Sequence, residues 1–456
     1  MLLTHDDETI IAQCTPTGSG AIALLRISGV HALEIADAMA RFGTQKKLMH
    51  VDSHTIHYGS VVDSHGALVD NVLFMVMKSP RTFTGQDVVE ISCHNNQFII
   101  NAIVQSALSY GARLAKEGEF SRRAVLNKKI DLVQAEAINE LIGAQTQQAL
   151  KKALSQVNGS FSHWISIIEK QMIKAMAFCE ASFEFIDEEL EFSDQITIMV
   201  NETLATISQV KKSFDNQQHI RSGIKIAFLG SVNAGKSSLF NAILGKNRAI
   251  VTPIAGTTRD SIEAGLTKDG SFWTLIDTAG LRITHDVVEQ EGIKRSMEQA
   301  RLADIVVLVY DASRELTPQE SDVYERLLKD FENKIVVVHN KIDQKNNNAC
   351  EQFPKGIEVS AQQHYQIDAL LAVLTEKIQA ITALHDSPFL LNSRQYILLT
   401  TLENKLVDIA SMLEHPEYEL LSIHFNDALA HLSELTGKTV SEQTMDAVFN
   451  EFCVGK

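Results

Sequence analysis

The sequence predicts a multidomain chain of α/β plus α architecture, and three observations carry that prediction. Short β-rich runs alternate with helical stretches over residues 1–118, which is typical of an α+β domain. Apolar residues at helical spacing dominate residues 119–220 and return in residues 381–456, which predicts a helical bundle. Residues 221–380 instead hold apolar strands that end in polar or glycine-rich turns, which predicts an α/β domain inserted between the two helical parts.

The first part alternates strands and helices. Its β-rich runs, each bounded by turn signals, are Thr9–Ala12, Ala21–Ile27, Thr55–Val62, Asn71–Met77 and Val88–Ser92. Helical stretches lie between them at His31–Ala40 and Gln97–Tyr110. This alternation predicts an α/β or α+β domain.

The helical parts are defined by apolar stripes at steps of three and four residues. The stripes before the inserted domain are Ile130, Val133, Ala137, Leu141 and Ala144, then Phe161, Trp164, Ile168, Met172, Ala175 and Cys179. Those after it run from Leu399 to Leu413 and from Leu421 to Leu435, and a short helix capped by Ser441 follows. Such stripes are typical of helix packing, so we expect both helical parts to form one bundle. The acidic stretch Glu184–Asp194 is expected to be a solvated helix end or loop.

A phosphate-binding loop is the strongest local signal. The run Gly230–Ser237 fits G-x-x-x-x-G-K-[ST], follows the apolar run Ile224–Leu229 and precedes the helical segment Ser238–Leu244. That strand–loop–helix context is the one the motif requires. Backbone N–H groups would point at phosphate oxygens, Lys236 would reach the β- and γ-phosphates, and the Ser237 hydroxyl would hold Mg²⁺.

Three further motifs follow in the order that a Ras-like GTPase requires. The strand Trp273–Ile276 ends in Asp277-Thr278-Ala279-Gly280, which places an acid beside the Mg²⁺ site. The strand Ile335–Val338 leads to Asn340-Lys341-Ile342-Asp343. The Asp343 carboxylate can accept from N1–H and the exocyclic amine of guanine, which adenine cannot offer. Val359-Ser360-Ala361 is expected to close the base pocket, so the sequence predicts GTP binding.

The usual hydrolytic residue of such proteins is missing. Ras-like GTPases position the attacking water with a Gln directly after the Asp-x-x-Gly motif, and this chain has Leu281 there. Asn233 in the phosphate loop and the segment Thr252–Asp260, a candidate first switch with Thr258 as its Mg²⁺-sensing threonine, offer oxygen ligands for a monovalent cation. Such a cation can replace an arginine finger, an effect worth roughly 10³ to 10⁵ in rate. The alternative for Asn233 is a turn residue that tolerates unusual backbone angles.

Composition limits the function classes. A length of 456 residues predicts two to four domains, and a net charge of −16 argues against a protein that grips nucleic acid by phosphate neutralisation alone. Any nucleic acid would be held by a local patch or by a partner. Five scattered cysteines without a C-x-x-C pair indicate neither disulfides nor zinc. With no signal peptide or membrane span indicated, we expect a cytoplasmic protein.

Several further motifs are specific to one family. They are Thr15-Pro16-x-Gly18-x-Gly20, Leu25-Arg26-Ile27-Ser28-Gly29, Phe83-Thr84-Gly85-Gln86-Asp87, Gly118-Glu119-Phe120-Ser121, Leu126-Asn127-x-Lys129-Ile130-Asp131-Leu132, Gln134-Ala135-Glu136, Ile254–Asp260 and the terminal Phe452-Cys453-Val454-Gly455-Lys456. With them the chain resembles the tRNA modification GTPases of the MnmE (TrmE) family over essentially its whole length.

The resemblance implies a homodimeric, potassium-activated GTPase whose N-terminal domain is similar to folate-dependent one-carbon enzymes. With a flavoprotein partner of the MnmG (GidA) type, which brings FAD, such a protein installs an aminomethyl or carboxymethylaminomethyl group on carbon 5 of the wobble uridine of certain tRNAs. The one-carbon donor would be a tetrahydrofolate derivative, 5-formyl or methylene. The expected domains are a folate-binding and dimerisation domain at 1–118, helical parts at 119–220 and 381–456, and a GTPase domain at 221–380.

Together the motifs and the resemblance assign site residues. Those expected at GTP are Asn233, Ala234, Gly235, Lys236, Ser237, Ser238, Thr252, Pro253, Ile254, Ala255, Gly256, Thr257, Thr258, Asp277, Thr278, Ala279, Gly280, Asn340, Lys341, Asp343, Ser360 and Ala361. Mg²⁺ would be held by Ser237 and Thr258, potassium by Asn233, Thr252, Ile254 and Thr257, and the folate by Arg26, Glu90, Lys129 and Lys456. Glu289 would orient the attacking water, and Cys453 is a candidate nucleophile or proton carrier.

The chain departs from the family pattern at two turns. His94-Asn95-Asn96 stands where the family has His-Gly-Gly, and Lys116-Glu117-Gly118 stands where it has Arg-Pro-Gly. Because Asn tolerates left-handed backbone better than most residues, we expect the first turn to be kept.

Other GTPase classes fit the sequence less well. A ribosome-assembly or signalling GTPase that acts as a binding switch shares the phosphate loop, the loop Asn and the missing Gln, but usually adds a basic RNA-binding module that the sequence does not indicate. A membrane-remodelling GTPase would need a basic or apolar lipid-facing element, which the sequence also does not indicate.

The cation hypothesis gives a direct prediction. GTP turnover should be fast in potassium and slow in sodium at equal ionic strength, because the smaller ion fits a carbonyl cage poorly. Asn233→Ala should remove the difference and leave nucleotide binding largely intact. Steady-state phosphate release in the two salts measures the effect, and equal rates for the unmodified protein would contradict the hypothesis.

Overall fold

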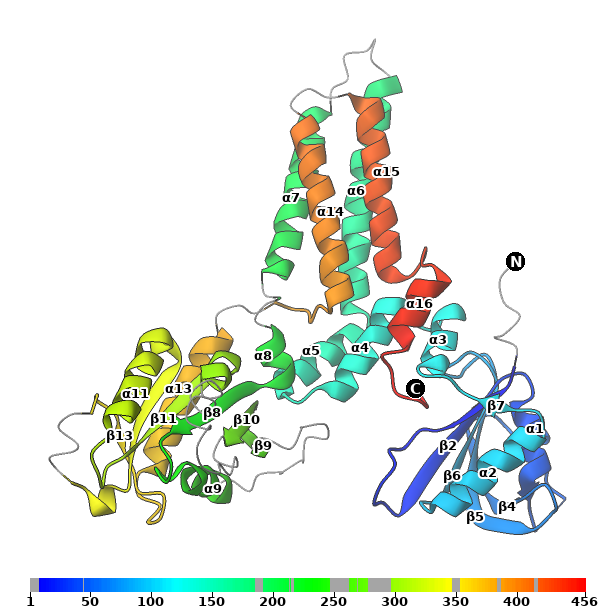
Figure 1. Ribbon diagram of the computed structural model, residues 1–456. Coiled ribbons are helices and arrows are strands. Elements are labelled where there is room, and N and C mark those ends of the chain that lie inside the picture. The colour runs from blue at the N-terminus through cyan, green and yellow to red at the C-terminus, as the bar shows by residue number, and fades with distance from the viewer. Residues whose placement is uncertain are drawn as a thin grey trace. The chain divides into compact units, whose positions relative to one another are not determined.

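The structure is a computed structural model that describes residues 8–43, 45–184, 192–212, 214, 217–246, 262–268, 270–277, 297–346, 353–383, 387–413 and 417–456. The chain forms two compact units (Figure 1). Unit 1 comprises Met1–Asn139, Leu154–Leu204 and Ile397–Lys456, and unit 2 comprises Glu140–Ala153 and Ala205–Tyr396. Each unit has its own sheet and its own apolar core. The predicted division into four domains groups the residues differently and stays a prediction.

Unit 1 is built on a seven-stranded sheet with the order β3-β4-β5-β6-β2-β1-β7. Its strands are β1 (Ile10–Gln13), β2 (Ile22–Ser28), β3 (Ala40–Arg41), β4 (Thr55–Val62), β5 (Leu68–Met77), β6 (Val88–His94) and β7 (Arg113–Leu114). Neighbours pair antiparallel except β1 and β7, which are parallel. Helices α1 (Ala32–Met39) and α2 (Gln97–Ser109) share the core on one face of the sheet, so the predicted α+β domain is confirmed (Figure 1).

The first departure from the family pattern forms a helix start. The Asn96 side chain accepts from the Phe98 N–H and caps α2, and its backbone φ of −124° is extended. The Asn95 side chain donates to the Gly18 carbonyl over 2.8 Å. Capping therefore stabilises this turn, and the expectation of left-handed backbone is wrong, because neither Asn95 nor Asn96 has a positive φ.

Two helices that come before and after the inserted domain in the sequence pack together in unit 1. Helix α6 (Ser160–Glu184) carries the predicted stripe that includes buried Phe161, Met172 and Cys179. Helix α15 (Tyr418–Thr436) packs along α6, so the segments before and after the inserted domain meet as expected. The other helices with residues in unit 1 are α3 (Glu119–Leu126), α4 (Leu132–Gly143), α5 (Gln147–Val157), α7 (Ser193–Lys211), α14 (Ser393–Met412) and α16 (Glu442–Phe449).

Unit 2 is built on a six-stranded sheet with the order β13-β12-β11-β8-β10-β9. Its strands are β8 (Ile224–Gly230), β9 (Ile262–Lys268), β10 (Ser271–Asp277), β11 (Ile305–Asp311), β12 (Ile335–Asn340) and β13 (Ile357–Glu358). All neighbours are parallel except β9 and β10. Helices α9 (Lys236–Lys246) and α13 (Ile367–Ala383) share the core on one face, and α11 (Pro318–Asp330) shares the core on the other. The predicted inserted α/β domain is confirmed.

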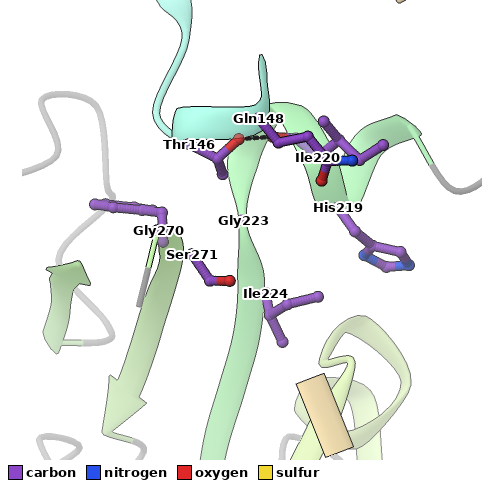
Figure 2. A pocket seen from close by; sticks show the side chains of 9 residues that line it. Thr146, Gln148, His219, Ile220, Gly223, Ile224, Gly270 and Ser271 are labelled. Carbon is purple, nitrogen blue, oxygen red and sulfur yellow. Dashed lines mark hydrogen bonds between the residues drawn. The ribbon is translucent and has the colours of Figure 1, made fainter. Parts of the chain in front are cut away.

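The segments next to this sheet form hydrogen bonds near the starts of β8 and β10, at the end of the sheet opposite the phosphate loop. The Thr146 hydroxyl donates to the Ile220 carbonyl, beside a small pocket that reaches Gly223 and Gly270 (Figure 2). The Gln147 N–H donates to the Gly270 carbonyl over 3.3 Å. Only glycine fits at position 223, because its φ is 76° and an added Cβ would lie 2.0 Å from a backbone oxygen. These bonds explain why Glu140–Ala153 belongs to unit 2.

Among the described helices, none combines the length and the apolar composition that crossing a membrane requires.

Candidate functional site

The phosphate loop joins β8 to α9, as the motif predicts. Gly230 ends the strand and Lys236 begins the helix. Gly235 has a φ of 87°, and an added Cβ would lie 2.2 Å from Nδ2 of Asn340. A glycine is required there because any side chain would collide with the neighbouring strand end.

Lys236 is held inside the loop. Its Nζ donates to the Gly230 carbonyl over 2.8 Å and to the Ser231 carbonyl over 2.7 Å. Burial lowers the pKa of Lys236, and the Asp277 carboxylate, buried at the end of β10, acts in the opposite direction. A cation in a loop of backbone N–H groups gives this end of the sheet the character of an anion site.

Asn340 connects the phosphate loop to the predicted base loop. Its Nδ2 donates to the Ala234 carbonyl over 2.9 Å, and its Oδ1 accepts from the Ala361 N–H over 3.0 Å. The side chain is 2% exposed, so both bonds form away from water. Ser360 and Ala361 are buried in the same place. Loops that follow different strands therefore form one connected site at the carboxyl ends of the parallel strands.

The rest of the Asn-Lys-x-Asp motif shapes the base loop. Lys341 has a φ of 63°, and its Nζ donates to Oδ2 of Asp311 over 2.7 Å. This ion pair fixes the end of β12 to the end of β11. Asp343 follows in a short 3₁₀ helix, Ile342–Gln344, and is exposed, so its carboxylate is open to a base.

A second support for the phosphate loop was not predicted. The Ser231 N–H donates to the Tyr324 hydroxyl over 2.7 Å, and that hydroxyl donates to the Val309 carbonyl over 2.7 Å. Nη2 of Arg314 donates to the Ser231 hydroxyl over 3.1 Å and also pairs with Glu320. The supporting residues lie in β11 (Val309), in α11 (Glu320 and Tyr324) and in the loop between them (Arg314). No sequence motif marks them.

The remaining predicted nucleotide residues divide into two groups. Asn233 has a φ of 62° and is exposed in the phosphate loop, and Ser237 and Ser238 are exposed at the start of α9. The positive φ agrees with the interpretation of Asn233 as a turn residue. It does not test the interpretation of Asn233 as a ligand of a monovalent cation. Outside the described residues lie Thr252, Pro253, Ile254, Ala255, Gly256, Thr257, Thr258, Thr278, Ala279, Gly280, Leu281 and Glu289.

A separate cluster of predicted residues lies in unit 1. Arg26 on β2 stands opposite Glu90 on β6, and its Nε donates to Oε1 of Glu90 over 2.8 Å. The Arg26 guanidinium carbon lies 6.0 Å from the Phe83 ring centre and 5.4 Å from the Phe120 ring centre. Cys14 is close by and was not predicted. Burial raises the pKa of its thiol, Arg26 lowers it and Glu90 raises it.

The C-terminal tail lies beside this cluster. The Phe120 N–H donates to the Lys456 carbonyl over 3.0 Å, and the Gly118 N–H donates to the Cys453 carbonyl over 3.4 Å. Gly455 has a φ of 93°, and an added Cβ would lie 2.4 Å from the Gln13 carbonyl oxygen. The tail is thereby pressed against the end of β1, where the Cys453 side chain is exposed.

Lys129 lies on a neighbouring loop. Its Nζ donates to the Pro80 carbonyl over 2.8 Å. Of the four predicted folate residues, the structure thus pairs Arg26 with Glu90, attaches the main chain of Lys456 next to Phe120, and places Lys129 against the loop that carries Phe83.

A mostly parallel sheet with a glycine-dependent phosphate loop after β8 and an Asn-Lys-x-Asp loop after β12 defines a P-loop protein of the GTPase class. Family models confirm and sharpen this class. The model "MnmE helical domain" matches residues 132–453, and the model "GTP-binding protein TrmE N-terminus" matches residues 9–129. The chain belongs to the MnmE family of tRNA modification GTPases.

Individual relatives agree over nearly their whole lengths. The tRNA modification GTPase MnmE of Geobacillus thermodenitrificans is 38% identical over 472 residues, covering 98% of this chain and 99% of that protein. The protein of the same name from Acetivibrio thermocellus is 36% identical over 469 residues, covering 99% and 100%. That of Cytophaga hutchinsonii is 36% identical over 462 residues, covering 100% and 99%.

The exposed carboxylate of Asp343 leads to a prediction about base choice. Asp343→Asn should weaken GTP binding and improve XTP binding, with a combined change in preference of roughly 100-fold or more, because a site built for one hydrogen-bond pattern rejects the other. Competition between the two nucleotides at limiting concentration measures the preference. Asp322→Asn, at an exposed position of α11, is the matched control. An unchanged preference in Asp343→Asn would show that this residue does not read the base.

Proposed function

We propose that this chain is a potassium-activated GTPase that, with a flavoprotein partner of the MnmG type, modifies carbon 5 of the wobble uridine of certain tRNAs. The observation that carries the proposal is the coexistence of two separate polar sites in a chain of the MnmE family. One is the Asn340-centred nucleotide loop of unit 2, and the other is the Arg26–Glu90 cluster of unit 1.

The nucleotide site accounts for GTP binding and its metals. The Gly230–Lys236 loop supplies backbone N–H groups and one ammonium group for the phosphates, and Asp343 is open to the guanine base. Mg²⁺ would be held by the exposed Ser237 hydroxyl and by Thr258, with Asp277 as support. A bound Mg²⁺ ion neutralises charge on the phosphates.

Potassium and the attacking water complete the hydrolytic proposal. Asn233 would hold potassium with Thr252, Ile254 and Thr257, and Glu289 would orient the water. The Asn233 side chain is exposed in the phosphate loop, which is where a charge-neutralising cation is needed in the absence of a Gln at Leu281.

The unit 1 cluster suits a folate. Arg26 and Lys129 can bind carboxylates, Glu90 can accept from the amino and N–H groups of a pterin edge, and the exposed Phe83 ring gives an aromatic wall. A tetrahydrofolate derivative, 5-formyl or methylene, supplies a one-carbon unit when bound. Lys456 would contribute from the tail. FAD belongs to the partner in this proposal.

Exposed apolar side chains on one face of the unit 1 sheet support the proposed homodimer. Ile56, Tyr58 and Leu73 are 64%, 71% and 42% exposed, and Tyr58 stands opposite Leu73 in the register. Phe74, the next residue, lies in the core under α1 and α2, so Leu73 points to the other face. A second copy of the chain would cover these apolar side chains.

Measurement of wobble-uridine modification, with the unmodified protein and with Cys453→Ser, tests the proposed function. In a deletion strain complemented with the unmodified gene, mass spectrometry should find the modified wobble uridine. Cys453→Ser should keep potassium-stimulated GTP hydrolysis, because unit 2 is untouched, and should fail to restore the modified nucleoside. Unmodified wobble uridine with the intact protein would contradict the proposed function, and full restoration by Cys453→Ser would leave the tail a structural role.

A further inference from the structure

We propose that a cationic rim at one end of the first sheet binds the phosphate backbone of the tRNA. The rim consists of Lys46, Lys47, Lys78, Arg81, Lys128 and Lys129. These residues come from three loops that are distant in the sequence. The proposal rests on the proposed function, because it takes a tRNA as the substrate.

Hydrogen bonds hold the three loops together. Nζ of Lys78 donates over 3.0 Å to the carbonyl of Met49, in the turn that directly follows Lys46 and Lys47. Nζ of Lys129 donates over 2.8 Å to the carbonyl of Pro80, the neighbour of Arg81. The loop after β5 therefore contacts both other loops, so the three loops that carry the six cations are joined.

The rim is open to a ligand. Lys78 is half-buried, and the other five cations are exposed. Two nearby acids already accept backbone hydrogen bonds: Oδ1 of Asp37 from the Leu48 N–H over 2.6 Å, and Oδ1 of Asp87 from the Ser79 N–H over 2.8 Å. These hydrogen bonds hold both carboxylates against the main chain without removing their charge, and the five exposed cations remain accessible to solvent.

A cationic group of this size stands out in an anionic chain. The net charge is −16, so the molecule as a whole repels a polyanion. Any direct contact of this chain with RNA phosphates therefore needs a local concentration of Lys and Arg, since such contacts supply most of the sequence-independent affinity for nucleic acid. The rim is such a concentration.

The rim adjoins the Arg26–Glu90 cluster. The loop after β5 also carries Phe83, which is 38% exposed and lies 6.0 Å from the Arg26 guanidinium carbon. The hydroxyls of Ser28 and Thr84 hydrogen-bond over 2.8 Å and fix this loop to β2. A uridine brought to the cluster would place the phosphates of its neighbours over the rim, and an exposed aromatic ring beside it can stack on a base.

The experiment compares two variants of equal charge. The rim variant carries Lys46→Gln, Lys47→Gln, Arg81→Gln and Lys128→Gln, and leaves Lys129 unchanged because it is a predicted folate residue. The control variant carries Lys151→Gln, Lys170→Gln, Lys212→Gln and Lys329→Gln, all at exposed positions elsewhere. The full-length proteins are assayed with the flavoprotein partner for wobble-uridine modification, GTP hydrolysis, and tRNA affinity from 50 to 200 mM salt.

The rim variant should bind tRNA more weakly by roughly 600-fold at 0.15 M salt, since it loses four phosphate contacts and each costs about fivefold there. Its slope of log affinity against log salt should become shallower by about 3, at 0.7–0.9 per phosphate. Its GTP hydrolysis without tRNA should be unchanged. The control variant should match the unmodified protein in all three assays.

Three results would overturn the proposal. Equal tRNA affinity and salt slope in the rim and control variants, with modification intact in the unmodified protein, would remove the rim and leave the proposed function standing. Lost modification in the rim variant, with its tRNA affinity and salt slope equal to those of the control variant, would give the rim a role other than tRNA binding. Absence of modification by the unmodified protein would reject the proposed function and the rim together.

Discussion

The nucleotide site depends on one buried amide. Asn340 is the only described residue whose side chain donates to the phosphate loop, at Ala234, and accepts from the base loop, at Ala361. Both partners are main-chain atoms, so the geometry does not depend on neighbouring side chains. Leaving either group unpaired inside the protein would cost about 1–3 kcal/mol. Gly235 must be glycine for the same reason, because Asn340 occupies the space of a Cβ. The site is thus shaped before a nucleotide arrives.

The two polar sites belong to different units with separate cores, and they share no residue among those that the structure describes. Four helices pass from one unit to the other, namely α4, α5, α7 and α14. The bonds of Thr146 and Gln147 fix the start of α5 to the strands of unit 2, close to where β8 begins.

The sequence predicted the features that depend on local pattern. Strand β4 has the predicted bounds, and the phosphate loop and the Asn-Lys-x-Asp loop follow the predicted strands, because apolar runs and glycine turns are read from neighbouring residues. Strands β3, β7 and β13 were not predicted, since two residues carry no period, and β9 and β11 were not predicted either. Tyr324, Arg314 and Cys14 also escaped, because their roles come from contacts across strands that no spacing encodes. The rim is of the same kind: each loop holds a few ordinary lysines, and folding gathers them.

In the nucleotide-free protein, Asn340 joins the phosphate loop to the base loop. Hydrogen exchange of the Ala361 amide, measured without nucleotide in the unmodified protein, Asn340→Asp and Asn340→Ala, tests it most directly. Asn340→Asp keeps the acceptor for that amide and Asn340→Ala removes it. We expect the Ala361 amide to exchange about tenfold faster or more in Asn340→Ala than in the unmodified protein, because a buried hydrogen bond is lost. In Asn340→Asp we expect near-normal protection of that amide. Equal protection in all three proteins would contradict it.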